Sequence, residues 1–461
     1  MANSRSAVVF KHASSSLLAL FKGKGLYNET IKTMAFSILI LVINMVTGMI
    51  TARMLGPEGR GLLTTMILWP QFLGFATAFG LSSALLYHVK KSPEEEGDLY
   101  YSSLIICGCT GLFAIAIGVV FIPFWIDGHS LSTILVGQFF MLVAPFMHLF
   151  FLSNAFFRAR EEFHLFNRMR YAVPLLTLMS LLVLSAADFL TPYTAGLAYL
   201  VPFVPVVAWA VYVGIKIHRP RLRGLGSSIK RIFRYGMGSY GIDLLGNIIL
   251  YVDQIILVAL LAPGPLGLYV VAVSLSRIVN VFSSSIVMVL FPKATGLPDD
   301  KAALLILRVF KLSTAFAVLG ASIIILVAPT LMNFLYGGQF LGAIPVFRLL
   351  LFDVVIGGAA FVLAQAFMAT GKPIIVTVSQ AIGIVLVIPL MYFLVPNYGI
   401  IGAGWALLIP SIVRLIFILV VFKWKFKYKL GPLFLITGKD ISWLKDTIQA
   451  KKAKKEGSVE L

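Results

Sequence analysis

The chain has 461 residues, of which 59% are hydrophobic and only 12% are charged. No water-soluble domain of this size carries that balance without a very large exposed apolar surface, so the composition excludes a soluble protein. The formal net charge of +19 would indicate nucleic-acid binding in a soluble chain, but here the position of the basic residues gives a different explanation.

The apolar residues fall in blocks of roughly 17 to 28 residues, each long enough to cross a hydrocarbon core of about 30 Å as a helix. We expect six spans in the first half, at 33–51, 62–88, 101–125, 133–157, 171–187 and 193–217. Six more follow at 236–261, 267–291, 312–336, 345–368, 374–395 and 401–422. Because the runs do not alternate between apolar and polar residues, they exclude a membrane barrel. The prediction is an all-α membrane protein of about twelve transmembrane helices.

Residues 1–32 precede the first span and contain a short apolar patch at 16–21. The patch is too short for the core of a signal peptide, so we expect an interfacial helix within a cytoplasmic segment. Most of the 38 Lys and Arg residues lie before the first span, in the connections on that same side of the membrane, and after the last span. This is the positive-inside pattern, and it predicts a bacterial cytoplasmic-membrane protein with both termini in the cytoplasm.

The basic residues are densest in two segments, at 216–234 and 423–429. The first lies in the longest connection, a predicted cytoplasmic linker at 218–235, and the second opens a basic cytoplasmic tail at 423–461. We expect both to contact anionic lipid headgroups. This explanation accounts for the positive charge without nucleic acid as a partner.

The two halves of the chain repeat short patterns. Residues 55–62 read L-G-P-E-G-R-G-L and residues 261–268 read L-A-P-G-P-L-G-L, and each stretch lies between the first two spans of its half. In the same way Asn154-Ala155-Phe156 corresponds to Gln365-Ala366-Phe367. Since each half has an even number of spans, the sequence predicts two parallel-related six-helix lobes, an N-lobe at 33–217 and a C-lobe at 236–422.

Nothing in the connections indicates enzyme chemistry. The loops are short, the acidic run at 94–98 has no partnering histidine or metal-ligand spacing, and no glycine-rich phosphate loop occurs. Cys107 and Cys109 lie two residues apart within one predicted helix, so they point to different faces and cannot chelate a metal together. We therefore expect no enzyme activity, no cofactor and no metal.

Five ionisable groups stand out inside predicted spans: Arg277, Arg348, Arg414, Asp243 and Asp253. A charged group at the centre of a membrane helix costs at least about 2.5 to 3.5 kcal/mol, so such residues are compensated or used. Arg277 falls near the middle of its span. The alternative to a ligand-binding role for Arg277 is a structural role in a buried ion pair with Asp253.

Arginine suits phosphate and pyrophosphate because its planar guanidinium donates paired hydrogen bonds and stays charged. We predict that a pyrophosphate and sugar headgroup is bound by Arg53, Arg277, Arg348, Arg414 and Asn280, the last of which shares the helix face of Arg277. Interfacial anchoring is the alternative for Arg53, at the end of the first span. Asp253 and Asp243 are the candidates for coupling transport to a proton or cation.

Several motifs resemble those of one family. Residues 52–61 read A-R-M-L-G-P-E-G-R-G, residues 251–269 contain Asp253 followed by G-L-Y at 267–269, and Phe291-Pro292 and the turn at 335–338 complete the set. Together they resemble bacterial polysaccharide-export flippases, within the multidrug/oligosaccharidyl-lipid/polysaccharide exporter superfamily. The resemblance implies two six-helix lobes around a central basic cavity, and it places Arg53, Asp253 and Arg277 at positions of the family pattern.

The expected function is translocation of a polyprenyl-pyrophosphate-linked oligosaccharide from the inner to the outer leaflet, by alternating access, for cell-surface polysaccharide biosynthesis. The expected partners are that lipid-linked glycan and membrane lipids, with a glycan polymerase and glycosyltransferases as further candidates. One alternative is a cation-coupled multidrug-type antiporter, against which the first lobe shows no clear mid-helix acid. Another is a non-transporting scaffold of a glycan-assembly complex.

Overall fold

A computed structural model describes residues 26–217, 225–427 and 442 of the chain. These residues form helices and connecting turns, with no strand among them. The predicted interfacial helix at 16–21, the centre of the predicted basic linker and nearly all of the predicted tail lie outside the described residues.

The chain divides into two compact units, Met1–Tyr251 and Val252–Leu461. The boundary lies inside the helix α10 (Leu225–Leu260), whereas the sequence predicts a division within the linker at 218–235. The first part of α10 belongs to the first unit because it packs closely on the end of an earlier turn: a Cβ at Gly236 would come within 2.6 Å of the Phe79 carbonyl oxygen.

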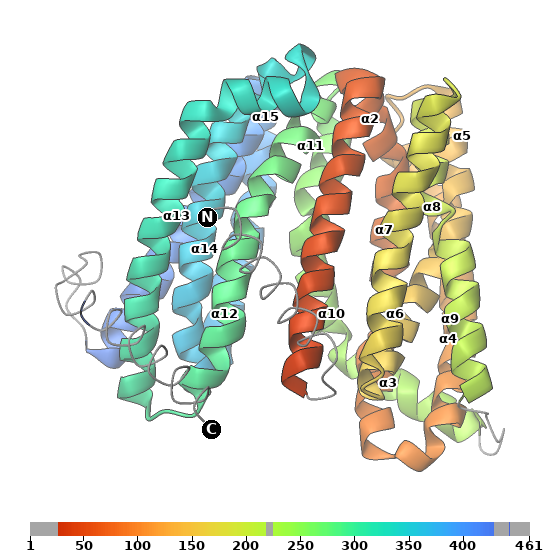
Figure 1. Cartoon of the computed structure of the whole chain (residues 1–461), viewed down its shortest axis with the longest axis horizontal. Helices are drawn as coiled ribbons and strands as arrows, with labels where there is room; N and C mark the ends of the chain where they lie inside the picture. The colour runs from red at the N-terminus through yellow and green to blue at the C-terminus, as the bar shows by residue number, and fades with distance from the viewer. Residues whose placement is uncertain (1–25, 218–224, 428–441, 443–461) are drawn as a thin grey trace, which may run out of the picture. The chain divides into compact units, whose positions relative to one another are not determined.

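The first unit is a bundle of helices connected by short turns (Figure 1). Before α10 its elements are α2 (Leu26–Ala76), α3 (Leu81–Lys91), η1 (Pro93–Glu95), α4 (Glu96–Trp125), α5 (Leu131–Phe140), η2 (Met141–Val143), α6 (Ala144–Ala159), α7 (Phe163–Ala186), α8 (Pro192–Leu200) and α9 (Phe203–Ile217). One buried cluster of this unit includes Tyr100 and Phe156, whose rings stack with centroids 4.1 Å apart.

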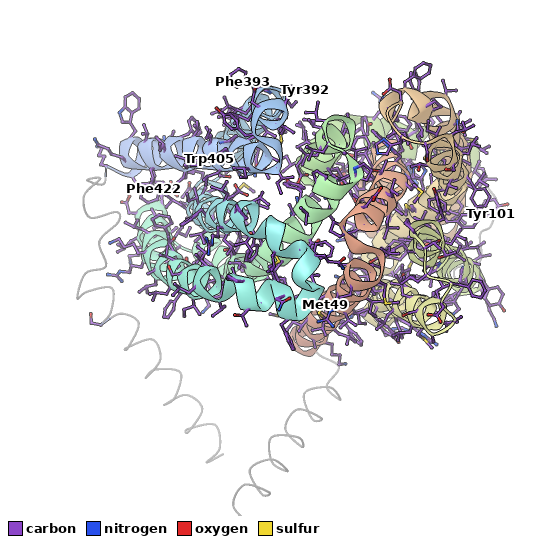
Figure 2. All side chains as sticks on the ribbon, turned by 90° about the horizontal axis from the view of Figure 1, so that it is seen from above. Met49, Tyr101, Tyr392, Phe393, Trp405 and Phe422 are labelled. Atoms are coloured by element: carbon purple, nitrogen blue, oxygen red, sulfur yellow. The ribbon has the colours of Figure 1, made fainter. Side chains whose placement is uncertain are left out.

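The second unit is built around α14 (Ile344–Ala369), whose side chains are buried along most of its length. The other elements are α11 (Pro263–Ser276), η3 (Arg277–Val279), α12 (Asn280–Thr295), α13 (Asp299–Tyr336), η4 (Gly338–Ala343) and α15 (Pro373–Phe426). Figure 2 shows Tyr392 and Phe393 at the outer edge of this unit, where both rings are exposed, whereas Phe422 is fully buried. Exposed aromatic rings on helices of this kind are typical of a lipid-facing surface.

Two long helical stretches turn sharply at a glycine. Within α2, Gly56 has φ 66°, and within α15, Gly399 has φ 56°, a left-handed conformation that favours glycine. Arg60 donates a hydrogen bond to the Thr51 hydroxyl at 3.0 Å, although residues nine apart in a straight helix are separated by about 13 Å along the axis. Each stretch is therefore two helices joined at one residue.

Nine helical stretches among the described residues are long and apolar enough to cross a membrane. Two of them, 32–91 and 373–426, contain the turns at Gly56 and Gly399, so each has the length of two spans, and α10 adds a shorter apolar segment at 247–260. These helices agree with the twelve predicted spans. The prediction of an all-α membrane protein is confirmed.

The predicted duplication is visible in the turns α6–α7 and α14–α15, each inside its own unit. Glu161 and Gly371 both adopt left-handed φ values, 60° and 69°. The following residue in each turn, Glu162 or Lys372, donates its backbone N–H to a phenylalanine carbonyl five residues earlier. The same turn also pairs with the start of another helix in each unit, through Arg160–Glu96 at 2.8 Å and Lys372–Asp299 at 3.3 Å.

Candidate functional site

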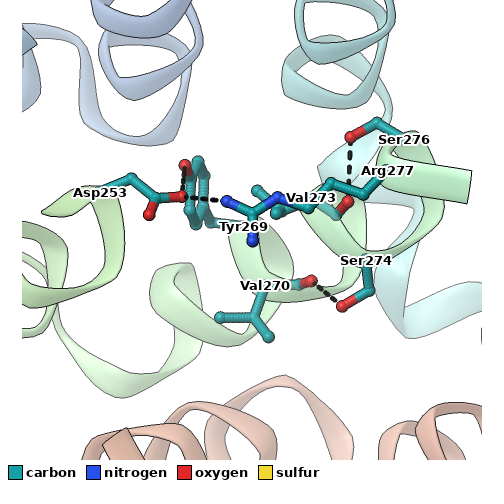
Figure 3. Close-up of polar contacts among 7 residues, drawn as sticks. All are labelled: Asp253, Tyr269, Val270, Val273, Ser274, Ser276 and Arg277. Carbon is teal, nitrogen blue, oxygen red and sulfur yellow. Dashed lines mark hydrogen bonds and ion pairs between the residues drawn. The ribbon is translucent and has the colours of Figure 1, made fainter. Parts of the chain in front are cut away.

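The second unit contains an ion pair between Arg277 and Asp253. One terminal nitrogen of Arg277 lies 3.1 Å from Oδ2 of Asp253, and the Tyr269 hydroxyl donates to the same oxygen at 2.9 Å (Figure 3). The three residues come from η3, α10 and α11. The ion pair that the sequence leaves open as an alternative is therefore present.

Arg277 lies where α11 gives way to the 3-10 turn η3, within a candidate span at 263–295. The hydroxyls before it are occupied locally, because Ser274 donates to the Val270 carbonyl at 2.7 Å and Ser276 to the Val273 carbonyl at 3.0 Å (Figure 3). Neither serine is bonded to the guanidinium in these contacts. Arg277 instead reaches Asp253 on α10.

The two members of the pair differ in exposure. The Asp253 side chain is 2% exposed, whereas the Arg277 side chain is 40% exposed. Oδ2 of Asp253 accepts two hydrogen bonds, but its buried Oδ1 has no partner among the described residues. The carboxylate is thus fixed inside the unit, and the guanidinium retains N–H donors that the pair does not use.

A further charged residue of this unit, Asp353, is not among the site residues predicted from the sequence. Asp353 on α14 accepts a hydrogen bond from the Ser411 hydroxyl of α15 at 2.5 Å, and it interacts electrostatically with Arg414, Arg277 and Asp253. An aspartate in the middle of an apolar span is itself a signal that would have identified it.

The position of the Arg414 side chain depends on Gly383. The two halves of α15 approach each other beside Arg414, and a Cβ placed on Gly383 would stand 2.8 Å from the Arg414 Cδ. Only hydrogen at this position leaves room for the arginine stem. Nε of Arg414 is buried without a hydrogen-bond partner among the described residues.

Two arginines and two aspartates of the second unit lie near enough to influence one another electrostatically, although only Arg277 and Asp253 are in direct contact: Arg277, Arg414, Asp253 and Asp353. The group is neutral when all four are ionised, which lowers the cost of placing each charge in an apolar bundle. In such a group an incoming anion can compete with an aspartate for an arginine. A proton or a cation can then compensate the charge of the released aspartate.

The remaining predicted residues lie elsewhere. Asn280 is exposed at the first position of α12, and Arg348 is exposed in the first turns of α14. Arg53 is exposed on α2, shortly before the turn at Gly56. Asp243 lies in the first unit, where it accepts a hydrogen bond from the Ser83 hydroxyl at 2.8 Å.

Among the described residues, no three His, Cys, Asp or Glu side chains gather closely enough to hold a metal ion. The arrangement around Arg277 fits an anionic ligand, since its unused groups are N–H donors.

Comparison with known sequences gives one family match, to the family described as polysaccharide biosynthesis protein, over residues 50–345. A Shigella flexneri protein named "Putative O-antigen transporter" is 22% identical over 381 residues, covering 77% of this chain and 87% of that protein. A Klebsiella pneumoniae protein, "Uncharacterized membrane protein in cps region", is 25% identical over 398 residues, covering 83% of this chain and 79% of that protein.

Two solved structures are similar in fold. The lipid II flippase MurJ, in an inward closed conformation, matches with a TM-score of 0.72 at 15% identity, over 85% of this chain and 87% of that one. An inward-facing multidrug resistance MATE family transporter of the MOP superfamily matches with a TM-score of 0.67 at 14% identity, over 86% of this chain and 95% of that one. At these identities the likeness concerns the fold alone.

Proposed function

Because the chain belongs to the polysaccharide biosynthesis protein family, we propose that it is a flippase for a polyprenyl-pyrophosphate-linked oligosaccharide. It moves this lipid from the inner to the outer leaflet of the bacterial cytoplasmic membrane, by alternating access, for cell-surface polysaccharide assembly. A glycan polymerase and glycosyltransferases are its proposed partners in that assembly, and both chain termini are proposed to lie in the cytoplasm.

The family and fold identify a membrane transporter of the flippase type rather than an enzyme. The resemblance predicted from the motifs at 52–61 and 251–269 is confirmed at the level of the family, since the match begins at residue 50 and includes both segments. The substrate belongs to the proposal, and the arrangement of Arg277 supports it.

The observation that carries the proposal is the unequal exposure of the Arg277–Asp253 pair. A buried pair that serves packing alone needs partners for all its donors and acceptors, because each desolvated charge is costly. Here Arg277 keeps 40% of its side chain exposed while Asp253 keeps 2%. Asp253 and Tyr269 therefore orient a guanidinium whose outer donors are free to bind the oxygens of a pyrophosphate.

Asp253 is the stronger of the two candidates for ion coupling. When a pyrophosphate binds Arg277, it weakens the attraction between Arg277 and Asp253, and the carboxylate becomes an incompletely compensated charge in a buried site. Its unbonded Oδ1 is the atom that would take up a proton or contact a cation. Asp243 is the second candidate. A proton or a cation would there replace the hydrogen bond that the carboxylate accepts from Ser83.

The other predicted residues have more peripheral proposed roles. Arg414 supports the same electrostatic group from α15, where it interacts with Asp353. Arg53, Arg348 and Asn280 are exposed, and we assign them to contacts with the headgroup or its sugars at the ends of the path.

A leaflet-translocation assay in proteoliposomes containing a lipid-linked glycan tests the proposal. Arg277→Ala is expected to lower the rate at least about 100-fold, because a charge-assisted contact to phosphate is worth about 1.5–3 kcal/mol and the aspartate left behind adds a further penalty. Arg277→Lys keeps the charge but not the planar fork and should be intermediate. Lys293→Ala, at an exposed position near the end of α12, is the matched control. Equal rates in all four proteins would remove Arg277 from the mechanism and favour a scaffold.

The position of Asp243 favours a second candidate, the cation-coupled antiporter. In the sequence the first lobe shows no clear mid-helix acid, which counts against an antiporter. In the structure, however, Asp243 belongs to the first unit. Growth of a deletion strain on toxic cationic drugs separates the two functions. Drug resistance that depends on the wild-type chain and is lost in Asp243→Asn would support the antiporter, whereas a flippase gives no such phenotype.

A further inference from the structure

The first unit contains an open cavity of about 810 Å³ between the end of α3 and the first turns of α10. Eight residues line it, and all belong to the first unit: His88, Ser227, Lys230, Arg231, Arg234, Tyr235, Gly238 and Ser239. Arg277 and the charged group of the second unit contribute nothing to this lining. The cavity is therefore a separate feature of the molecule.

The lining is strongly basic and largely uncompensated. Arg231 pairs with Glu95 at the end of η1. Lys230 and Arg234 are exposed, and within the described part of the chain neither forms an ion pair with a carboxylate. The three cations lie within little more than one turn of α10 and repel one another, so an anion among them relieves the repulsion.

Two buried nitrogens in the lining provide an independent indication of a ligand. His88 is only 8% exposed, and its Nε2 is buried with no hydrogen-bond partner among the described residues. The Nε of Arg231 is buried and unbonded in the same way. Unsatisfied buried polar atoms are costly and rare in proteins, and here both belong to residues that line one cavity. An oxygen-rich anion in the cavity can give each nitrogen a partner once the His88 and Arg231 side chains shift slightly towards it.

The cavity wall is held in place by packing. The rings of Tyr87 and Tyr235 stack with centroids 4.5 Å apart, and the His88 ring meets Tyr235 edge-on at 5.3 Å. Just beyond them, Gly80 and Gly236 allow α10 to contact the turn before α3 so closely that a Cβ on either glycine would collide with backbone. The cations therefore stand on a fixed surface, as a preorganised anion site requires.

We propose that this cavity binds the phosphate group of a lipid headgroup at the face of the membrane where α3 ends, and that its occupant is the pyrophosphate of the lipid-linked substrate before translocation. The second part of this inference rests on the proposed flippase function. The distribution of basic residues predicts that this face is cytoplasmic, which is the face from which such a substrate is collected. Cations supply the attraction, and the aromatic rings offer a surface for the first sugar or prenyl unit.

Calorimetric titration of the purified full-length protein with farnesyl pyrophosphate tests the site. Arg277→Ala serves as the background for all variants, so that binding at Arg277 does not contribute. In that background Lys230→Gln/Arg234→Gln removes two cavity cations, and Lys423→Gln/Lys425→Gln removes the same charge from exposed positions at the end of α15. The cavity variant should lose at least about 10-fold in affinity and the control should not change.

Two further ligands distinguish the sources of phosphate. Short-chain phosphatidylglycerol is titrated in parallel, with farnesol as the uncharged probe. If the cavity variant loses affinity for farnesyl pyrophosphate alone, the result supports the substrate as the occupant. If it loses affinity equally for both phosphate ligands, the result supports a general phosphate-headgroup site and overturns the selectivity of the cavity for the substrate. Unchanged affinity in the cavity variant, or equal losses in cavity and control variants, overturns the site. Since no translocation is measured, failure of the flippase assay leaves the binding result intact.

Discussion

The two units satisfy their buried polar groups in different ways. In the first unit the buried polar side chains among the described residues are neutral or histidine, and His148 bonds to the hydroxyls of Thr77 at 3.0 Å and Thr110 at 3.2 Å. In the second unit the buried polar side chains include Asp253 and Lys311. The sequence predicts that the two halves are repeats of one pattern, yet their buried polar groups differ.

The difference indicates where ligand chemistry is concentrated. Neutral hydrogen bonds between membrane helices contribute on the order of 0.6 kcal/mol each and need nothing beyond the bundle. Charges in the same environment are costly, so a bundle that could use hydroxyls but carries arginine and aspartate retains them for another reason. From this comparison we propose that the second unit binds the charged part of the cargo during translocation, while the interior of the first unit serves chiefly as framework.

The comparison is tested most strongly by neutralising the charged pair. Asp253→Asn leaves Arg277 without its counter-charge, and loss of one partner from a buried pair costs about 3–5 kcal/mol, here towards the low end because Arg277 is partly exposed. We expect a lower thermal unfolding midpoint in detergent and a large loss of translocation. Asp253→Asn/Arg277→Gln should recover much of the stability but none of the transport.

Recovery of transport in that double variant would contradict the comparison. It would mean that a neutral amide pair serves as well as the ion pair, as neutral pairs do in the first unit.

The next largest effect is expected at Gly383. In Gly383→Ala the new methyl group would stand 2.8 Å from the Arg414 Cδ, which forces the arginine to move. Overpacking of this kind costs about 1–3 kcal/mol, and the displaced guanidinium should reduce transport severalfold. Gly320→Ala on α13 is the matched control because nothing lies within 4 Å of its added Cβ. A transport rate for Gly383→Ala equal to that of Gly320→Ala would show that Arg414 needs no defined position.

In the first unit, His148→Leu should affect stability and leave transport unchanged. Thr77 retains its bond to the Leu73 carbonyl at 2.8 Å and Thr110 its bond to the Cys107 carbonyl at 3.4 Å, so neither hydroxyl loses all its partners. We expect a cost of about 1–2 kcal/mol, measured as the unfolding midpoint. A translocation rate per folded molecule that falls as far as in the Asp253 variant would contradict the assignment of this unit as framework.

The smallest effect is expected outside the membrane spans, at the turn between α6 and α7. The hydrogen bond from Lys90, at 2.6 Å, lowers the pKa of Glu161 below its usual value. A lowered carboxyl pKa stabilises the fold above the pKa of the unfolded chain, and this contribution disappears as the pH falls through the folded value. Lys90→Ala should therefore shift the unfolding midpoint slightly at neutral pH and not at all in acid. A shift of the same size at both pH values would exclude the ion pair as its cause.

Much of the fold followed from the sequence because apolar run length and turn glycines are local properties. The runs on either side of Gly56 and Gly399 indicated separate spans, and the positive φ of both glycines shows why each long helical stretch turns there. The repeat of residues 154–156 at 365–367 predicts equivalent helices, and in the structure Asn154 and Gln365 both bond to the carbonyl four residues earlier.

The candidate site was harder to predict because side-chain pairing across distant helices has no local signature. Asp353 and Ser411 are 58 positions apart, and α14 is apolar on all sides, so its sequence does not say which face meets α15. The choice between ligand contact and ion pair for Arg277 likewise depends on how α10 and α11 pack. Only the geometry shows that Arg277 can do both.

The turns at Gly56 and Gly399 have a consequence for how the protein enters the bilayer. Because each connection is a single residue in the folded chain, we expect the two crossings that it joins to enter lipid together as a helical hairpin. Its tip also offers a protease no extended segment to cleave, which makes these the points where the folded chain should resist digestion longest.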